Sequence, residues 1–360
     1  MAHRFSLAQW LIEQGAEVAV ICPSGAHQEA LQEVGIHVYP MDWTRQGLTL
    51  LGTWRAAKFI RCAVKSFNPD IVHCVSIRCI LLYWLAGNKG SPRKVINHVI
   101  GMGSVFSEQS KGCRAKGLKA IVTRTLKQAF KRGNAVNVFQ NQDDINAWQC
   151  EMELPDLQWD LIPGSVPWEP SHVEEPSGQR FRILFVGRML KDKGVRELCH
   201  AWRGIRTKDA TVELVLCGDV DAGNPKSLSE NELKELAEAE GIQWLGRRDD
   251  VAEQMTQANL VVLPSYREGL PRVLLEAGLA NRAVVTTDVP GCREVVEHKV
   301  SGLLVPPEDV AALQSAIMML KEDEVMRRNF AEALTHRVQQ LFVDDVVNPR
   351  WWTLYQKEHP

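Results

Sequence analysis

The stretch "VVLPSYREGLPRVLLEAGLANRAVVTT", residues 261–287, carries a complete strand–loop–helix–strand pattern. An apolar run ending at Ser265 gives way to a polar loop, and a β-branched run closes the stretch. Proline favours the first position of a helix, so we expect the helix over 271–280. Two consecutive strands joined by a helix run parallel, and the stretch therefore predicts an α/β fold with a doubly wound sheet.

The same alternation of strands and helices runs through the rest of the chain. A proline-rich break at 162–179 interrupts it, because its four prolines cannot all lie in regular elements. The pattern predicts two Rossmann-like doubly wound domains facing a cleft. We divide the chain into an N-terminal acceptor-binding domain, a linker, a donor-binding domain and a closing helix, over 1–162, 163–180, 181–340 and 341–360.

Composition excludes several classes of protein. The 45% hydrophobic and 24% charged residues are those of a globular protein, and a net charge of −2 gives no support for nucleic-acid binding, so any charged partner would have to meet a local patch. Nine cysteines without a C-x-x-C pair indicate reduced thiols in a cytoplasmic protein. No apolar run reaches the ~20 residues of a membrane span, and we recognise no signal peptide.

Two glutamates in the opening stretch, Glu268 and Glu276, could form a helical ion-pair face, an acid/base pair or a nucleotide-sugar site. On one helix they would lie about 80° apart, which argues against a stacked pair. Pro271 instead separates them between a loop and a helix, at the sheet edge where such folds bind ligands. Backbone N–H groups near Leu270 could bind a diphosphate. Glu268 could then reach the hydroxyls of a group attached to that diphosphate, and Glu276 could bind a vicinal diol such as that of a ribose. Solvated glutamates near a helix start are the alternative.

A second stretch is "RILFVGRMLKDKGV" at 182–195. It begins with a predicted strand, which ends at Gly187. Arg188 and Lys193 flank the turn that follows. Two cations there could bind a diphosphate and stabilise the charge on a departing nucleotide. A solvated basic turn is the alternative.

The segment 110–132 carries eight basic residues and no acidic residue, together with an apolar stripe. This pattern predicts a basic amphipathic helix that docks on an anionic bilayer. An ordinary surface helix is the alternative. Nucleic acid is disfavoured because aromatic side chains do not alternate with the charges.

Four motifs occur in a fixed order: "FVGRMLKDKGV", "WLGRRDDV", "LVVLPSYREGLPRVLLEAGLA" and "TDVPGCREVVEHKVSGLLVPPED". Together, over about 180–340, they resemble the donor domain of family 4 retaining glycosyltransferases of the GT-B fold. The likeness is greatest to bacterial members that build capsular polysaccharide, O-antigen and lipid-linked oligosaccharides. It continues more loosely in "PDIVHCVSIR", "NHVIGMGSVFS" and "VFQNQDD".

The resemblance implies a role for each candidate donor residue. Arg188 and Lys193 would bind the diphosphate, Glu268 the donor sugar and Glu276 the ribose. The remaining donor-side candidates are Gly187, Gly269, Leu270, Pro271 and, near the base, Arg247. Weaker candidates on the acceptor side are His98, Gly101 and Gly103.

The resemblance also implies the reaction and the partners. The chain would be a retaining hexosyltransferase that needs no metal or other cofactor. Its donor would be a UDP- or GDP-linked sugar, and its acceptor a saccharide on a polyprenyl diphosphate. The protein would be cytoplasmic and peripheral on the inner membrane, and the basic pattern of 110–132 makes that helix the candidate for contact with the inner leaflet.

The sequence departs from this family at its start. A doubly wound domain opens on a strand, yet here Met1 leads directly into a helix pattern, so we expect the first strand to be missing. This leaves a non-catalytic nucleotide-sugar-binding remnant as one alternative and a nucleotide-sugar epimerase as another. A glycoside hydrolase would need two carboxylates flanking the bond, which this pattern does not offer.

Overall fold

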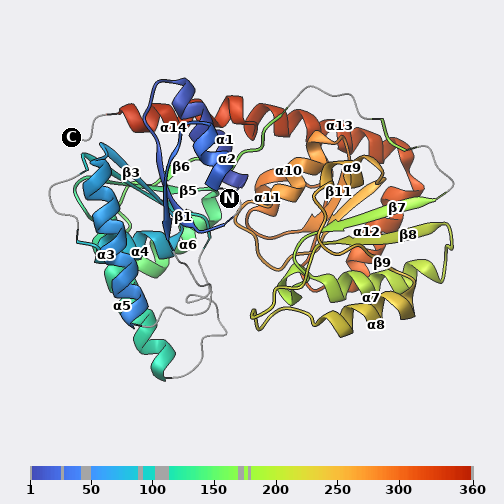
Figure 1. The fold of residues 1–360 in the computed structure, drawn as a ribbon. Helices are drawn as coiled ribbons and strands as arrows, with labels where there is room; N and C mark the ends of the chain where they lie inside the picture. The colour runs from blue at the N-terminus through green and yellow to red at the C-terminus, as the bar shows by residue number, and fades with distance from the viewer. Residues whose placement is uncertain are drawn as a thin grey trace. The chain divides into compact units, whose positions relative to one another are not determined.

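The structure is a computed structural model that describes residues 2–25, 28–41, 50–87, 92–101, 113–168, 174–176 and 180–357. The chain divides into two compact units (Figure 1). Unit 1 comprises Met1–Pro163 and Asp344–Pro360, and unit 2 comprises Gly164–Val343. Each unit is an α/β structure with parallel strands, as the alternating pattern predicted.

Unit 2 contains a parallel sheet whose described strands are β7 (Phe181–Val186), β8 (Val212–Cys217), β9 (Gln243–Trp244), β10 (Leu260–Leu263), β11 (Ala283–Thr287) and β12 (Leu303–Val305). Their spatial order is β12-β11-β10-β7-β8-β9, which is the doubly wound order of a Rossmann sheet. Residues of β10 and β11 are buried throughout, because helices cover both faces of the sheet. The sheet therefore confirms the predicted fold class.

The helices of unit 2 are α7 (Val195–Arg206), α8 (Glu230–Glu240), α9 (Val251–Thr256), α10 (Arg272–Leu279), α11 (Cys292–Val295), α12 (Val310–Glu322) and α13 (Glu324–Leu341), with a 3-10 turn, η2 (Lys191–Lys193). α7 and α8 lie on one face of the sheet, and α9 and α10 on the other (Figure 1). The last helical part of the unit is divided into two helices, because Asp323 ends α12 and caps α13 by accepting a hydrogen bond from the N–H of Met326.

The strand–helix–strand unit of the opening stretch is present as β10, α10 and β11. β10 and β11 are parallel, with Leu260 opposite Ala283. α10 begins one residue later than predicted, because Pro271 takes the N-cap position with an extended backbone. The loop between β10 and α10 thus holds Glu268, and Glu276 lies more than one turn inside the helix.

Unit 1 contains a four-stranded parallel sheet of β3 (Ile71–Val75), β4 (Lys94–Val99), β5 (Ala135–Phe139) and β6 (Asp160–Leu161), and a separate parallel pair, β1 (Ala19–Pro23) and β2 (His37–Met41). Its helices are α1 (Ala2–Glu13), α2 (Gln28–Glu33), α3 (Leu50–Phe67), α4 (Ile77–Leu85), α5 (Cys113–Phe130), α6 (Gln142–Met152) and α14 (Asp344–Gln356). Among the described strands, β1 pairs only with β2, and β3 only with β4. The sheet is thus interrupted where a doubly wound order places its first strand.

The C-terminal helix α14 belongs to unit 1. Trp351 is buried against His73 and His98, with ring centroids 4.7 and 4.8 Å away. The buried Lys94 donates hydrogen bonds from Nζ to the carbonyl oxygens of Leu354 and Tyr355, at 2.6 and 3.0 Å. A cation at this position satisfies carbonyls that the helix end leaves free and interacts favourably with the helix dipole. Lys94 therefore anchors the end of the chain to β4.

Candidate functional site

The carboxyl ends of the unit 2 strands meet at one edge of the sheet, because all the strands are parallel. Close backbone packing fixes the turns there. A methyl group on Gly218, after β8, would lie 1.9 Å from the carbonyl oxygen of Gly187, after β7. One on Gly194 would lie 2.1 Å from the carbonyl oxygen of Pro264, after β10. Only glycine fits at either position, so the turns after β7, β8 and β10 pack against one another.

The predicted cationic turn lies on this surface. Gly187 directly follows β7, and its N–H donates to the carbonyl oxygen of Cys217 at 2.9 Å. The side chain of Arg188 is exposed and forms an ion pair with Asp221 in the loop after β8. Lys193 ends the 3-10 turn η2. The turn after β7 therefore presents two cations at the sheet edge.

Lys193 and Glu268 are brought together although 75 positions separate them in the sequence. Nζ of Lys193 forms an ion pair with Oε1 of Glu268, and the two side chains are only 22% and 11% exposed. A hydrogen bond of 2.9 Å from the N–H of Tyr266 to the carbonyl oxygen of Asp192 joins the same two loops. The structure thus places a cation that could bind a phosphate beside a carboxylate that could accept hydroxyl protons.

Glu276 lies on α10 with a partner that the sequence analysis missed. Nε of Arg272 donates to Oε1 of Glu276 at 2.7 Å, and both side chains are partly exposed. The two residues are four positions apart, which places them on one helix face. This spacing was visible in the sequence. A ribose at Glu276 would share its carboxylate with Arg272.

The last residues of the loop before α10, Gly269 to Pro271, contribute backbone rather than polar side chains to this surface. A methyl group on Gly291, whose φ is 78°, would lie 2.5 Å from the carbonyl oxygen of Gly269. Leu270 packs against the core of unit 2, and Pro271 has no N–H to donate. Because the first N–H groups of a helix have no partner within it, the start of α10 can bind an anion.

Arg247 lies just beyond β9. Its N–H donates to Oδ1 of Asp219 at 3.1 Å, and its side chain points into solvent beside Asp249. Trp244, in β9, donates from Nε1 to the carbonyl oxygen of Gly218 at 2.8 Å. The segment predicted to flank the base is therefore fixed to the turn after β8.

Of the acceptor-side candidates, His98 is fully buried in β4. Its Nδ1 lies 3.0 Å from a guanidinium nitrogen of Arg4 and 3.1 Å from Nε2 of His73. Burial, with the nearby Arg4 charge, holds the pKa of His98 well below its ordinary value, so the ring is neutral. Gly101 follows β4 with a φ of 141°, and Gly103 lies outside the described residues.

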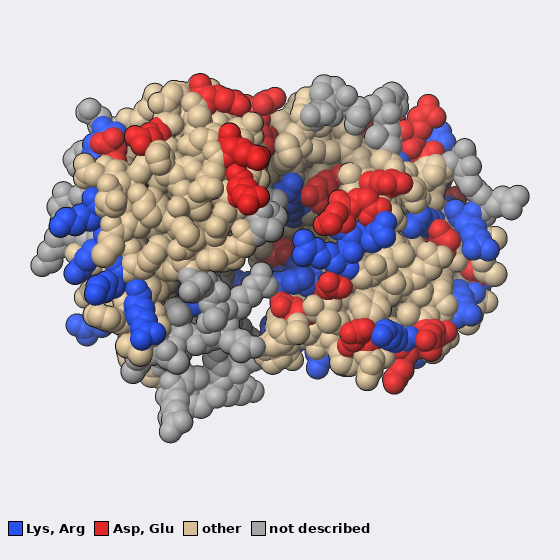
Figure 2. All heavy atoms as spheres, in the orientation of Figure 1, with Lys and Arg blue, Asp and Glu red and all other residues tan. Residues whose placement is uncertain are grey.

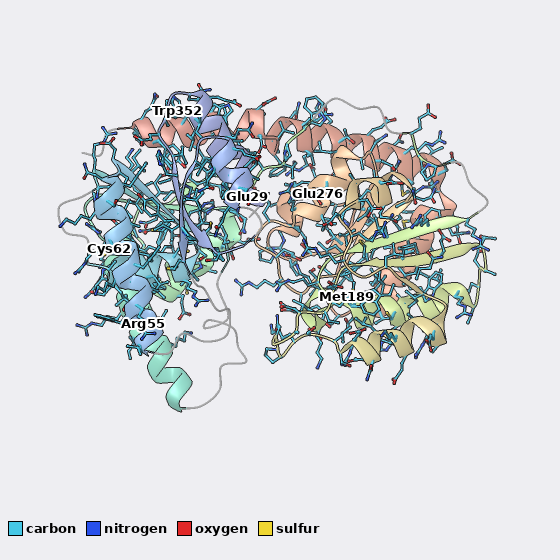
Figure 3. The ribbon with its side chains drawn as sticks, viewed as in Figure 1. Glu29, Arg55, Cys62, Met189, Glu276 and Trp352 are labelled. Atoms are coloured by element: carbon cyan, nitrogen blue, oxygen red, sulfur yellow. The ribbon has the colours of Figure 1, made fainter. Side chains whose placement is uncertain are left out.

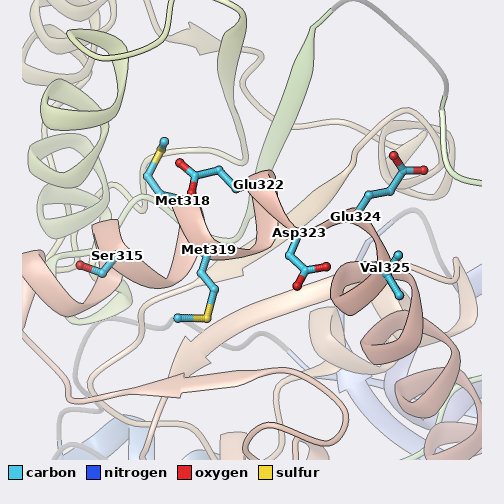
Figure 4. Close-up of a pocket in the computed structure, with 7 residues that line it drawn as sticks. All are labelled: Ser315, Met318, Met319, Glu322, Asp323, Glu324 and Val325. Atoms are coloured by element: carbon cyan, nitrogen blue, oxygen red, sulfur yellow. The ribbon is translucent and has the colours of Figure 1, made fainter.

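A depression of about 680 Å³ lies elsewhere in unit 2, where α12 meets α13 (Figure 4). It is lined by Ser315, Met318, Met319, Glu322, Asp323, Glu324 and Val325. Three carboxylates disfavour an anionic ligand, so this depression does not suit a nucleotide diphosphate.

No cluster of three or more His, Cys, Asp or Glu side chains suited to a metal ion is present among the described residues. Within the same ranges, no helix has the length and apolar character needed to cross a membrane.

Family models match both halves of the chain. The model described as "Glycosyltransferase Family 4" matches residues 3–138, and that described as "Glycosyl transferases group 1" matches residues 180–323. The second range contains the surface described above, from Gly187 to Glu276.

Individual proteins agree with the family models. The N,N'-diacetylbacillosaminyl-diphospho-undecaprenol alpha-1,3-N-acetylgalactosaminyltransferase of Campylobacter jejuni is 24% identical, over 98% of this chain and 94% of its own. The capsular polysaccharide biosynthesis glycosyltransferase CapM of Staphylococcus aureus is 29% identical, over 46% of this chain and 43% of its own.

Among solved structures, Anabaena Alr3699/HepE in complex with UDP-glucose superposes with a TM-score of 0.77, at 20% identity, over 98% of this chain and 94% of its own. WaaG, a glycosyltransferase involved in lipopolysaccharide biosynthesis, has a TM-score of 0.71 at 16% identity, over 98% of this chain and 94% of its own.

The chain contains two Rossmann-like units, and a glycosyltransferase family model matches each of them. The protein is therefore a glycosyltransferase of the GT-B class. Within that class it belongs to the family 4 glycosyltransferases, as its motifs predicted. The comparisons support neither the non-catalytic remnant nor the epimerase.

Proposed function

We propose that the protein transfers a hexosyl group from a nucleotide-diphosphate sugar to a lipid-linked saccharide, with retention of configuration, during the synthesis of a surface polysaccharide. The relative from Campylobacter jejuni is named for a diphospho-undecaprenol acceptor. A structural neighbour is a complex with UDP-glucose. These names support a UDP-sugar donor before a GDP-sugar donor, and a polyprenyl diphosphate as the lipid.

The observation that carries the proposal is the ion pair between Lys193 and Glu268 at the carboxyl edge of the sheet. A diphosphate bound between the turn after β7 and the start of α10 would meet Lys193, Arg188 and the first backbone N–H groups of α10. The sugar attached to it would then lie beside Glu268. Glu276, one turn into α10, would accept hydrogen bonds from the ribose diol.

Cations beside the diphosphate would assist glycosyl transfer with retention in the following way. The acceptor hydroxyl oxygen forms the new bond to the anomeric carbon while the bond from that carbon to the diphosphate oxygen breaks. The acceptor proton passes to the departing diphosphate, on the same face of the sugar. Lys193 and Arg188 stabilise the charge that develops on the diphosphate, so the reaction needs no metal ion in this proposal.

A lipid-linked acceptor places the reaction at a membrane surface, and we propose a position on the cytoplasmic face of the inner membrane. The sequence assigned this contact to the basic segment 110–132, whose described part is α5. Ile121 and Arg124 of α5 are exposed, but Lys119 and Lys127 form ion pairs with Glu151 and Glu153.

Calorimetric titration with UDP and GDP tests the donor half of the proposal. We expect one nucleotide to bind to wild-type protein, and the variant Lys193→Ala to bind it more weakly. If neither nucleotide binds, the site is wrongly placed. Conversion of a UDP-sugar to its epimer without acceptor would favour an epimerase, and binding without transfer to any lipid-linked acceptor would favour a remnant.

A further inference from the structure

Helix α3 of unit 1 has two distinct faces. It contains four basic residues and no acidic residue. The face toward the core consists of Ala56, Ala57, Ile60, Ala63 and Val64. The opposite, exposed face consists of Leu51, Trp54, Arg55, Lys58, Arg61, Cys62 and Lys65. At about 100° per residue these seven side chains occupy an arc of about 120°, so they form one continuous strip, here called the outer face of α3.

Large apolar side chains lie at the beginning of this outer face. Leu51 is 57% exposed and Trp54 is 60% exposed. Nζ of Lys58 lies 5.4 Å from the centre of the Trp54 ring. Tryptophan is enriched where a membrane meets water, because its ring is apolar and its N–H is polar. Lysine beside it can extend its ammonium group toward the headgroups.

The charges of the outer face are available to a partner. Arg55, Lys58 and Lys65 form no ion pair within the part of the chain that the structure describes. Figures 2 and 3 show Lys and Arg side chains along α3, with Arg55 pointing away from the unit. Arg61 differs, since its Nε donates to the carbonyl oxygen of Ala86.

The charges of the basic helix α5 are less available to a partner, because two of its lysines have acidic partners. Lys119 pairs with Glu151, and Lys127 pairs with Glu153, each at 2.8 Å. An acid beside a cation cancels most of its attraction for an anionic surface. The sequence favoured α5 because of its charge count, whereas the tertiary structure neutralises two of its lysines.

We propose that the outer face of α3 is the surface that docks unit 1 on an anionic bilayer. Trp54 and Leu51 lie at the level of the headgroups, and Arg55, Lys58 and Lys65 face the lipid phosphates. The inference rests on the proposed function, which requires a membrane-bound acceptor. A bilayer fits better than nucleic acid, because the apolar side chains lie at one end of the strip and do not alternate with the cations.

Co-sedimentation of the full chain with vesicles tests this surface. The vesicles are phosphatidylcholine alone, or phosphatidylcholine with phosphatidylglycerol. The variant Lys58→Gln/Lys65→Gln removes two charges and is expected to bind the anionic vesicles about 25-fold more weakly, about fivefold for each charge. Trp54→Ala is expected to weaken binding without changing its dependence on anionic lipid. All three positions are exposed, so melting temperatures should not change.

Two single substitutions serve as controls. Arg124→Gln removes an exposed charge from α5, and Lys208→Gln removes one from unit 2; both should bind vesicles as wild type does. The proposal is overturned if wild-type protein ignores anionic lipid, or if Arg124→Gln loses binding while the α3 variants keep it. Transfer to a short-chain, water-soluble acceptor is measured in parallel. Transfer by wild-type protein without vesicle binding would refute the docking surface alone. If wild-type protein shows no transfer, the proposed function is refuted.

Discussion

Replacing Lys193 by alanine tests whether the pair with Glu268 is both structural and catalytic. The substitution removes a cation from a site where both side chains are largely buried. The Glu268 carboxylate then remains in a low-dielectric environment without an ionic partner. Both the stability of unit 2 and the departure of the diphosphate should therefore change.

The expected loss of stability lies between two limits. Breaking a fully buried ion pair costs about 3–5 kcal/mol, and breaking an exposed pair costs about 0–1 kcal/mol. Because the Lys193–Glu268 pair is mostly but not wholly buried, we expect a loss of about 2 kcal/mol. Turnover should fall about 100-fold or more, since a donor aimed at developing negative charge is worth about 3 kcal/mol. Donor affinity should fall less, because much of this interaction strengthens only as the diphosphate departs.

Denaturant unfolding gives the free energy of unfolding, and transfer kinetics give kcat and donor affinity. The double variant Lys193→Ala/Glu268→Gln should recover most of the lost stability, because it also removes the unpaired charge, and should not recover kcat. Lys234→Ala, which breaks an exposed pair with Glu230 on α8, should change neither. Wild-type stability in Lys193→Ala would mean that the ion pair with Glu268 does not stabilise unit 2. Equal losses of kcat and affinity would reduce Lys193 to a binding residue.

Three further changes probe other parts of the molecule. Glu276→Ala should weaken donor binding by about 1–3 kcal/mol, because a buried ribose diol loses its acceptor; unchanged affinity in calorimetry would remove the ribose assignment. Burial holds the pKa values of His73 and His98 well below normal, so the unfolded chain binds more protons once the pH falls below about 6.5. The free energy of unfolding should then fall by up to about 1.4 kcal/mol per pH unit for each histidine, and His98→Asn should reduce that slope in unfolding curves across this range. Lys94→Met should destabilise unit 1 by about 1–3 kcal/mol, because the carbonyl oxygens at the end of α14 lose their donor; an unchanged unfolding midpoint would contradict the anchoring role.

Local signals were sufficient to predict most of the fold. The strand–helix–strand pattern around Pro271 depends on neighbours in the sequence, and β10, α10 and β11 lie within a few residues of the predicted ranges. Helix α6 was missed although its signal is local: the Asn141 side chain accepts a hydrogen bond from the N–H of Asp144 at the start of the helix. Helix α2, at six residues, is too short for a clear periodic pattern.

The candidate site depended more on tertiary structure. The sequence indicated Arg188, Lys193 and Glu268 as separate side chains, but their partners come from other loops. Asp221 lies 33 positions beyond Arg188, and no local spacing relates the two. The environment of His98 could not be predicted from spacing either, because Arg4, whose guanidinium group contacts the His98 ring, is 94 positions away. Spacing alone cannot show which charges a fold neutralises.

The anomeric configuration of the product tests most directly whether the carboxyl edge of the unit 2 sheet catalyses glycosyl transfer with retention. The purified protein is incubated with an α-linked UDP-hexose and a polyprenyl-diphosphate saccharide, and proton NMR gives the anomeric configuration of the product. We expect a new α-glycosidic bond on the lipid-linked saccharide, formed about 100-fold more slowly by Lys193→Ala. A β-linked product, or release of free sugar without transfer, would contradict this expectation.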